Sequence, residues 1–212
     1  MPKELFFKLD EEKRDRVINA AVDEFYEYGY HKASISRIVK RASIAKGSFY
    51  HYFEEKDDLY KYLFELGGER KIKYIGPVLM NIGAVDFFTL LRDTYLAGIR
   101  FSISEPKFSA IGQELVTMTN VKIKDEIMAE NDQKGIDFFM NLLKMAQVNG
   151  ELRLDLDLEF VAKMIIAFNM NIVDLYLKEC GEGPIDEEES MMKFVDKMID
   201  MLSLGIKKQN NE

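Results

Sequence analysis

The chain has 212 residues, a net charge of −8 and a hydrophobic content of 47%, which suits a folded globular protein with one large core or two smaller ones. Its single cysteine, Cys180, excludes an intramolecular disulfide and a cysteine-ligated zinc site, and it fits a reducing cytoplasm. Apolar runs such as Met164–Val173 have about half the length that a membrane span requires. We therefore expect a cytoplasmic protein that does not cross a membrane.

Patterns typical of catalysis and of metal binding are missing from the sequence. His31 and His51 are the only histidines, so a histidine-based triad or a histidine-rich metal site elsewhere in the chain cannot be built. The phosphate-binding and dinucleotide-binding glycine patterns are also absent. Acidic pairs such as Asp155 and Asp157 lie at a predicted helix start, where capping is the simpler explanation. We expect no enzyme activity, no cofactor and no metal.

The N-terminal residues predict a short lead-in and one long helix. Residues 1–9 are expected to be mobile. Asp10 can cap the helix that follows, because its carboxylate can accept from a backbone N–H of the first turn. The inward face of this helix is expected to run from Val17 to Tyr28, and Gly29 is expected to end it.

Ser34–Phe53 is predicted to form two short helices around a tight turn at residues 42–44. Ser34 is a good N-cap residue, because its hydroxyl can accept from an unpaired backbone N–H. Apolar residues recur at helical spacing in both halves of the stretch. Those expected to face the core are Ile35, Ile38, Val39, Phe49 and Phe53.

Positive charge is concentrated in the same stretch. From residue 30 to residue 53 there is no acidic residue, and the five basic ones are Lys32, Arg37, Lys40, Arg41 and Lys46. A basic island on an acidic chain is what a phosphate-facing surface requires. Two helices joined by a short turn form a helix-turn-helix, whose second helix can enter a major groove of DNA. The alternative is an ordinary helical hairpin with a solvated basic face.

This stretch resembles the signature of the TetR (tetracycline-repressor) family, which runs approximately Thr/Ser-x-x-x-Ile-Ala-x-x-Ala-Gly-Val-Ser-Lys-Gly-x-hydrophobic-Tyr-x-Tyr-Phe-x-x-Lys-x-x-Leu. The chain departs from it with Val39 at the usual Ala, Ser43 at the usual turn Gly and Ile44 at the usual Val. The matching positions are Ser34, Ile38, Ala42, Lys46, Gly47, Phe49, Tyr50, Tyr52, Phe53, Lys56 and Leu59.

The resemblance implies DNA contacts at eight positions. Those carried over as facing bases or the groove are Lys46, Gly47, Ser48 and His51, and Lys and His side chains can donate to guanine N7 or O6. Those carried over as phosphate or groove-wall contacts are Ser34, Tyr50, Tyr52 and Lys56. For the two tyrosines the alternative is packing within the DNA-binding head.

A linking helix is predicted to open at residues 54–58 and to stop before Gly76–Pro77. Gly67 and Gly68 interrupt it, and together they cost about 2 kcal/mol relative to alanine in a helix. We expect a hinge at this point, because the resembled family transmits ligand binding to the DNA-binding head there. The alternative is that the glycines let another helix pack closely.

The rest of the chain is helical in pattern, without a convincing strand. Helices are predicted at residues 84–104, 108–118, 122–148, 158–178 and 190–206, with an acidic loop at residues 179–189. The helices at 158–178 and 190–206 each carry an apolar stripe wider than one partner needs, which predicts a homodimer through these two helices. The alternative is that both stripes are buried in the core of the same chain.

The middle helices are rich in Phe and Met, which suit an adaptable apolar pocket. The predicted ligand-binding residues, with the polar side chains that interrupt these stripes, are Phe87, Tyr95, Phe101, Phe108, Gln113, Met118, Phe139, Phe168, Asn169 and Asn171. Few basic residues occur in these apolar stretches, and Arg92 and Arg100 are the exceptions. Since unmatched buried charge is costly, we expect a lipophilic ligand that is neutral or cationic.

The sequence therefore predicts an all-α protein in which a three-helix helix-turn-helix head is joined by a linking helix to a helical bundle. Residues 1–70 would form the DNA-binding domain, with its core motif at 34–53, and residues 71–212 the effector-binding and dimerisation domain. The resemblance implies a homodimeric regulator, usually a repressor, that binds a palindromic double-stranded DNA operator and responds to a small lipophilic effector. The alternative is a helical small-molecule-binding protein or enzyme that retains the head only as a scaffold. The five cations of the basic stretch, taken as unpaired, argue against this alternative, because a scaffold has no use for them.

Overall fold

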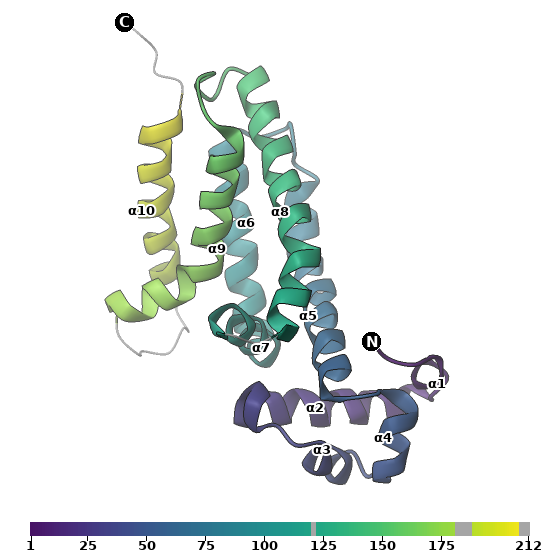
Figure 1. Ribbon diagram of the computed structural model, residues 1–212. Helices are drawn as coiled ribbons and strands as arrows, with labels where there is room; N and C mark the ends of the chain where they lie inside the picture. Colours follow the sequence, from purple (N-terminus) through teal and green to yellow (C-terminus); the bar gives the residue numbers. More distant parts are fainter. Residues whose placement is uncertain (120–121, 181–187, 208–212) are drawn as a thin grey trace, which may run out of the picture. The chain divides into compact units, whose positions relative to one another are not determined.

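A computed structural model describes residues 1–119, 122–180 and 188–207, and the side chains of 130–132, 173–174 and 177–180 also lie outside the description. The described residues form helices and no strand, apart from isolated bridges between Ile82 and Val85 and between Leu152 and Lys207. The predicted all-α class is confirmed (Figure 1). None of the described helices is long and apolar enough to cross a membrane.

The helices follow the predicted order with shifted ends. In chain order they are α1 (Glu4–Phe7), α2 (Glu11–Lys32), α3 (Ile35–Arg41), α4 (Lys46–Tyr52), α5 (Lys56–Leu79), α6 (Phe87–Ser104), α7 (Pro106–Thr117), α8 (Lys122–Val148), α9 (Leu158–Cys180) and α10 (Glu188–Ile206). Cys180, predicted in a loop, ends α9, and residues 181–187 of that loop lie outside the described residues.

The chain divides into two compact units. The first unit consists of residues 1–70 and 105–127, and the second of residues 71–104 and 128–212. The chain therefore passes from the first unit to the second after residue 70, where the sequence predicts a domain boundary. Residues 105–127, which the sequence assigned to the second domain, cluster with the first unit because α7 packs against α2.

The N-terminal residues are part of the core of the first unit, so the prediction of a mobile lead-in is wrong. Phe6 of α1 is fully buried, and its ring lies 4.9 Å from that of Phe53 and 5.5 Å from that of Tyr62 between centroids. The Lys3 N–H also donates to the Tyr52 carbonyl at 2.7 Å. These contacts fasten α1 to α4 and α5.

The first long helix begins and breaks at the predicted residues, and a short helical segment follows the break. The Asp10 carboxylate caps α2 by accepting from the Lys13 N–H at 2.8 Å. Gly29 interrupts the helix as predicted: it adopts the non-helical angles φ 69° and ψ 167°, and after this kink a short second helical segment runs to Lys32. The kink leaves Tyr28 exposed, against the prediction, and buries Tyr30 instead.

α5 is one continuous helix through Gly67 and Gly68, and it includes Pro77, so the predicted stop before Gly76 is wrong. A β-carbon added at Gly67 would lie 3.2 Å from Cδ1 of Phe108, which is tighter than an ordinary contact. At Gly68 the space is open. The geometry at Gly67 favours close packing, which was the alternative to a hinge.

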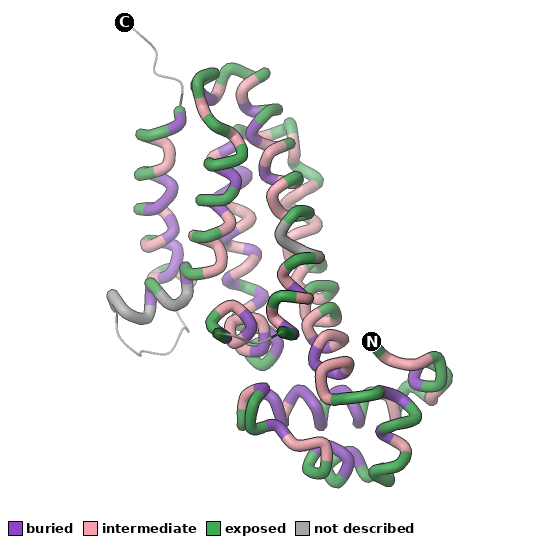
Figure 2. The backbone as a smooth tube through the Cα atoms, in the orientation of Figure 1, coloured by how far each residue is buried: buried purple, intermediate pink, exposed green. Residues whose placement is uncertain are grey.

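The second unit is a helical bundle in which α6, α8, α9 and α10 run alongside one another (Figure 1). Figure 2 shows α10 with buried residues along one side and exposed residues along the other. The centre of the core is formed by side chains with no exposed surface, which are Leu143, Leu152, Ala162, Ile165 and Val195.

Candidate nucleic-acid interface

α3 and α4 form a helix-turn-helix with a strained turn. The turn spans residues 42–45, and the Ile44 N–H donates to the Val39 carbonyl at 3.0 Å. Ser43, at the position where the resembled signature has glycine, adopts φ 55°. This left-handed conformation is costly for a residue with a β-carbon, so the turn keeps the geometry that the usual glycine supports.

A buried carboxylate fixes the start of α3. Glu24 of α2 is fully buried, and its Oε1 accepts from the Ser34 N–H at 2.8 Å and from Arg37 Nε at 2.7 Å. Ser34 is the N-cap residue, but its hydroxyl makes no cap hydrogen bond, so the predicted hydroxyl cap is wrong. The carboxylate of Glu24 satisfies the backbone at this end of the helix.

Two of the five cations in the basic stretch are paired. Arg37 pairs with Glu24 and stacks 4.1 Å above the centre of the Tyr28 ring. Arg41 donates to both carboxylate oxygens of Glu27, at 3.0 and 3.2 Å. The expectation of five unpaired cations is therefore wrong, since these two arginines hold α3 against α2.

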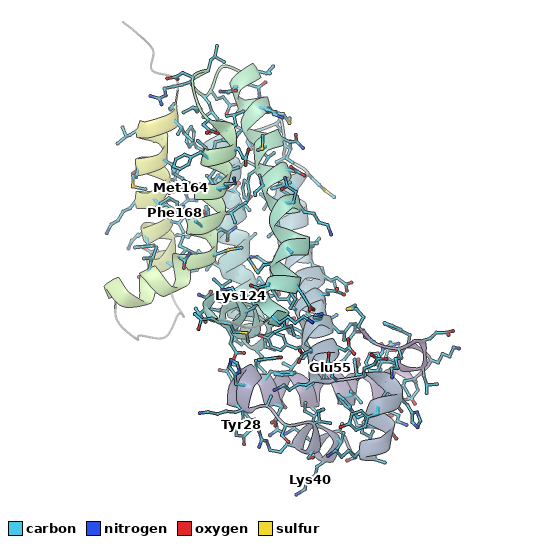
Figure 3. The ribbon with its side chains drawn as sticks, viewed as in Figure 1. Tyr28, Lys40, Glu55, Lys124, Met164 and Phe168 are labelled. Carbon is cyan, nitrogen blue, oxygen red and sulfur yellow. The ribbon has the colours of Figure 1, made fainter. Side chains whose placement is uncertain are left out.

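The other three cations, Lys32, Lys40 and Lys46, are exposed, and no described residue pairs with them. Figure 3 shows Lys40 projecting from α3 away from the other helices of the first unit. We call Lys40 of α3, together with the exposed residues of α4, the outer face of the helix-turn-helix. Its members are Lys40, Lys46, Gly47, Tyr50 and His51, with Ser48 half-buried among them.

Two of the predicted DNA contacts lie inside the first unit. Tyr52 is only 5% exposed, and its ring lies 6.0 Å from that of Phe6. Lys56 is half-buried; its Nζ donates to the Tyr30 carbonyl at 2.5 Å and lies 4.5 Å from the centre of the Tyr30 ring. Both side chains hold helices of the head together. For Tyr52, packing within the head was the alternative to a DNA contact.

Comparison with known families agrees with this geometry. The family model for bacterial regulatory proteins of the tetR family matches residues 17–63, which include α3, the turn and α4. A TetR-family transcriptional regulator from Chloroflexus aurantiacus has the same fold, with a TM-score of 0.73 and 29% identity, over 99% of this chain and 100% of that one. The chain belongs to the TetR family.

Other relatives of this TetR-family protein carry regulator names. The Escherichia coli K12 transcriptional regulator UidR is 25% identical over 165 residues, which are 76% of this chain and 79% of that protein. The Bacillus subtilis fatty acid metabolism regulator protein is 42% identical over 50 residues, or 24% of this chain and 26% of that one. The Bacillus subtilis regulator FadR, solved in complex with stearoyl-CoA, shares the fold with a TM-score of 0.70 and 20% identity, over 90% of this chain and 98% of that one.

The predicted ligand-binding residues are divided between the two units of the TetR-family chain. Phe108, Gln113 and Met118 belong to the first unit. There Phe108 packs under the Arg70 guanidinium, 4.4 Å from its ring centre. In the second unit the buried residues are Phe87, Tyr95, Phe101 and Phe139, while Phe168 and Asn169 are half-buried.

The remaining polar residues of the second unit that were considered for ligand binding lie at its surface and have hydrogen-bond or ion-pair partners there. Asn171 is exposed, and its Nδ2 donates to the carbonyl of Ala167 one turn earlier, at 2.7 Å. Arg92 pairs with Asp196 at 2.6 Å and Arg100 with Glu188 at 3.0 Å, and all four side chains keep much of their surface exposed. These two arginines therefore fasten α6 to α10.

Sequence reasoning missed the role of Glu24, although a signal for it exists. Glu24 lies on the predicted inward face of α2, one residue before Phe25, where a charged side chain needs a partner. Its partner, Arg37, comes from a different helix, so helical periodicity alone does not reveal the pair.

Proposed function

We propose that this TetR-family regulator is a homodimeric repressor that binds a palindromic DNA operator and is released by a small lipophilic effector. The observation that carries the proposal is the outer face of the helix-turn-helix. Lys40 and Lys46 are exposed there without an ion-pair partner among the described residues, next to Tyr50 and His51. On a chain with net charge −8, a face that carries unpaired cations can attract an anionic partner such as DNA.

The outer face supplies both kinds of contact that a DNA reader needs. Lys46, Ser48 and His51 would face base edges, since Lys and His donate to guanine N7 and O6. Tyr50, with 45% of its surface exposed, and Lys40 would contact phosphates, which set register and orientation. Lys56 and Tyr52 would act from behind, by holding the helices that carry these groups.

The proposed dimer interface lies on α9 and α10. α9 exposes Phe160, Met164 and Leu175, with exposed fractions of 61%, 38% and 40%. Figure 3 shows Met164 and Phe168 one turn apart on this helix. α10 adds Met201 and Leu204. Large apolar side chains clustered on two neighbouring helices are typical of a protein–protein interface, and a pair of helices from each subunit would make a four-helix contact.

A charge placed on α9 tests the dimer. Phe160→Glu should turn a dimer into a monomer in sedimentation at micromolar concentration, because an unpaired carboxylate would be buried at the interface. Val148→Glu is the matched control, since Val148 is a large exposed apolar residue at the end of α8. A folded Phe160→Glu variant that remains a dimer contradicts this interface.

DNA binding is tested with the DNA upstream of the protein's own coding sequence. The proposal expects a shifted band in a gel-shift assay with wild-type protein, and loss of that band when a lipophilic effector is added. If the head is only a scaffold, we expect no shifted band beyond the one that non-specific binding produces at the same protein concentration. Such a result would favour the helical binding protein or enzyme instead.

A further inference from the structure

A lysine of the second unit is largely surrounded by protein atoms and has no partner among the described residues. Lys71 lies on α5, and its ammonium makes no hydrogen bond or ion pair with any residue that the structure describes. Protein atoms surround it on nearly every side, although part of its surface remains accessible. Loss of water is the cause that lowers the pKa of this ammonium.

The Lys71 side chain runs along the seam between α5 and α6. A β-carbon placed on Gly98 of α6 would lie 4.0 Å from Lys71 Cε, so the absence of a side chain at Gly98 leaves room beside the lysine stem. One turn further along each helix, the rings of Tyr74 and Phe101 meet with 5.8 Å between their centroids. The lysine stem thus lies beside Gly98, and an aromatic pair from the same two helices lies one turn away in the sequence of each.

The other basic residues considered for effector recognition behave differently. Arg92 and Arg100 are half-exposed and each pairs with a carboxylate of α10. The expectation of a neutral or cationic effector considered these two arginines and did not consider Lys71. Both arginines are occupied at the surface, whereas Lys71 is largely surrounded by protein and has no partner among the described residues.

Holding an unpaired ammonium away from water costs free energy, and an anion that pairs with the ammonium offsets that cost. We propose that Lys71 binds the anionic head of an amphipathic effector, a singly charged alkyl carboxylate, whose apolar chain packs among the aromatic side chains of the second unit. The proposal rests on the effector-binding role proposed above and names the chemical class of that effector.

A single cation favours a single negative charge. A monocarboxylate would be neutralised by Lys71, and its alkyl chain would find apolar partners in the seam. A multiply charged head, such as that of a coenzyme A thioester, would bring further anionic groups that Lys71 cannot match. The proposal therefore separates a free acid from its thioester, although both carry the same chain.

The test measures binding of four probes with one chain length: decanoate, 1-decanol, decyltrimethylammonium and decanoyl-CoA. Isothermal titration and thermal shift are run on the full chain without DNA, as wild type and as Lys71→Met, which keeps the stem and removes the charge. Lys73→Met, at an exposed lysine of the same helix, is the matched control.

Wild type and the Lys73→Met control should bind decanoate about tenfold or more tightly than 1-decanol, the range expected for a hydrogen bond to a charged group. Lys71→Met should lose that preference while binding 1-decanol as well as wild type does. Equal binding of the acid and the alcohol by wild type overturns the proposal, as does a preference for decanoate that survives in Lys71→Met. Tightest binding of the cationic probe or of decanoyl-CoA also overturns it.

The wild-type comparison alone decides the charge preference if Lys71→Met does not fold. Operator binding is measured separately, without any probe. A protein that prefers decanoate through Lys71 but shifts no DNA contradicts the repressor role and leaves the anion site standing. A protein that binds its operator but shows no preference for the acid contradicts the anion site alone.

Discussion

Glu114 of α7 accepts a hydrogen bond from the backbone N–H of Tyr30 at 2.7 Å, where α2 turns at Gly29. The hydroxyl of Tyr60, from α5, donates to the Ile111 carbonyl at 3.2 Å and lies 3.4 Å from the other Glu114 oxygen. All of these residues belong to the first unit. α7 therefore holds the end of the helix that supports the helix-turn-helix.

Glu114→Ala should destabilise the first unit by about 1–3 kcal/mol, because the buried Tyr30 N–H would lose its acceptor. Urea unfolding, followed by circular dichroism, measures the change in free energy. Gln113→Ala is the control at the neighbouring half-buried position and should change stability much less. Equal losses in the two variants would show that the Glu114 hydrogen bond contributes nothing specific.

Gly29→Ala should also be strongly destabilising. Its φ of 69° with ψ of 167° lies in a region open essentially to glycine alone, which costs about 1–3 kcal/mol for other residues. An added β-carbon would also lie 2.7 Å from Oε1 of Glu114. Because the two effects share a site, the double variant Gly29→Ala/Glu114→Ala should lose less stability than the two single losses added together. Strict additivity would contradict the clash.

The two glycines of α5 should respond differently to replacement by alanine. Gly68→Ala should stabilise the helix by about 0.8–1 kcal/mol, because the space around Gly68 is open. Gly67→Ala should gain less or lose stability, because its β-carbon would press on Phe108 at 3.2 Å. Thermal unfolding of both variants measures this difference. If Gly68→Ala also blunts the effector response in a gel shift, the hinge prediction gains support; an unchanged response argues against it.

Lys71 should make stability depend on alkaline pH. Its pKa is lowered in the folded chain, so the unfolded chain binds more protons between that value and the unfolded lysine pKa of about 10.4. Stability from this group therefore rises as pH rises through that window. Denaturant unfolding at pH 7, 8 and 9 should show a steeper rise for wild type and for Lys73→Met than for Lys71→Met. Lys61 and Lys107, whose pKa values are raised by Glu126 and Asp23, act in the opposite direction and are common to all three proteins. Identical slopes would contradict a buried ammonium.

Local signals predicted the elements of the head well. The capping carboxylate of Asp10, the inward Phe49 and Phe53 and the turn after α3 all follow from neighbours in sequence. The predicted long helix at residues 122–148 has the observed bounds of α8. In each case the deciding interaction spans only a few residues, so periodicity and capping chemistry were sufficient.

Features that depend on distant partners were missed. Phe6 is buried only because α4 and α5 come to meet it, and Arg37 is paired only because Glu24 faces it from another helix. The sequence does not distinguish Lys71 from an ordinary helix-surface lysine, because its burial depends on the packing around α5. In the candidate site the family signature specifies Lys46, Gly47 and Tyr50, which are exposed, whereas Ser48 and His51 occupy variable positions of the signature.

The most direct test of the account is the affinity of the protein for its own upstream DNA as a function of salt, measured by fluorescence anisotropy. We expect log K to fall linearly with log salt for wild type. Lys46→Ala should weaken specific binding by about 1–3 kcal/mol, because Lys46 is exposed on the outer face without a partner among the described residues. Lys144→Ala, which removes the same charge from an exposed site on α8, should bind like wild type. A salt slope near zero for wild type, or equal affinities for the two variants, would contradict DNA recognition through this face.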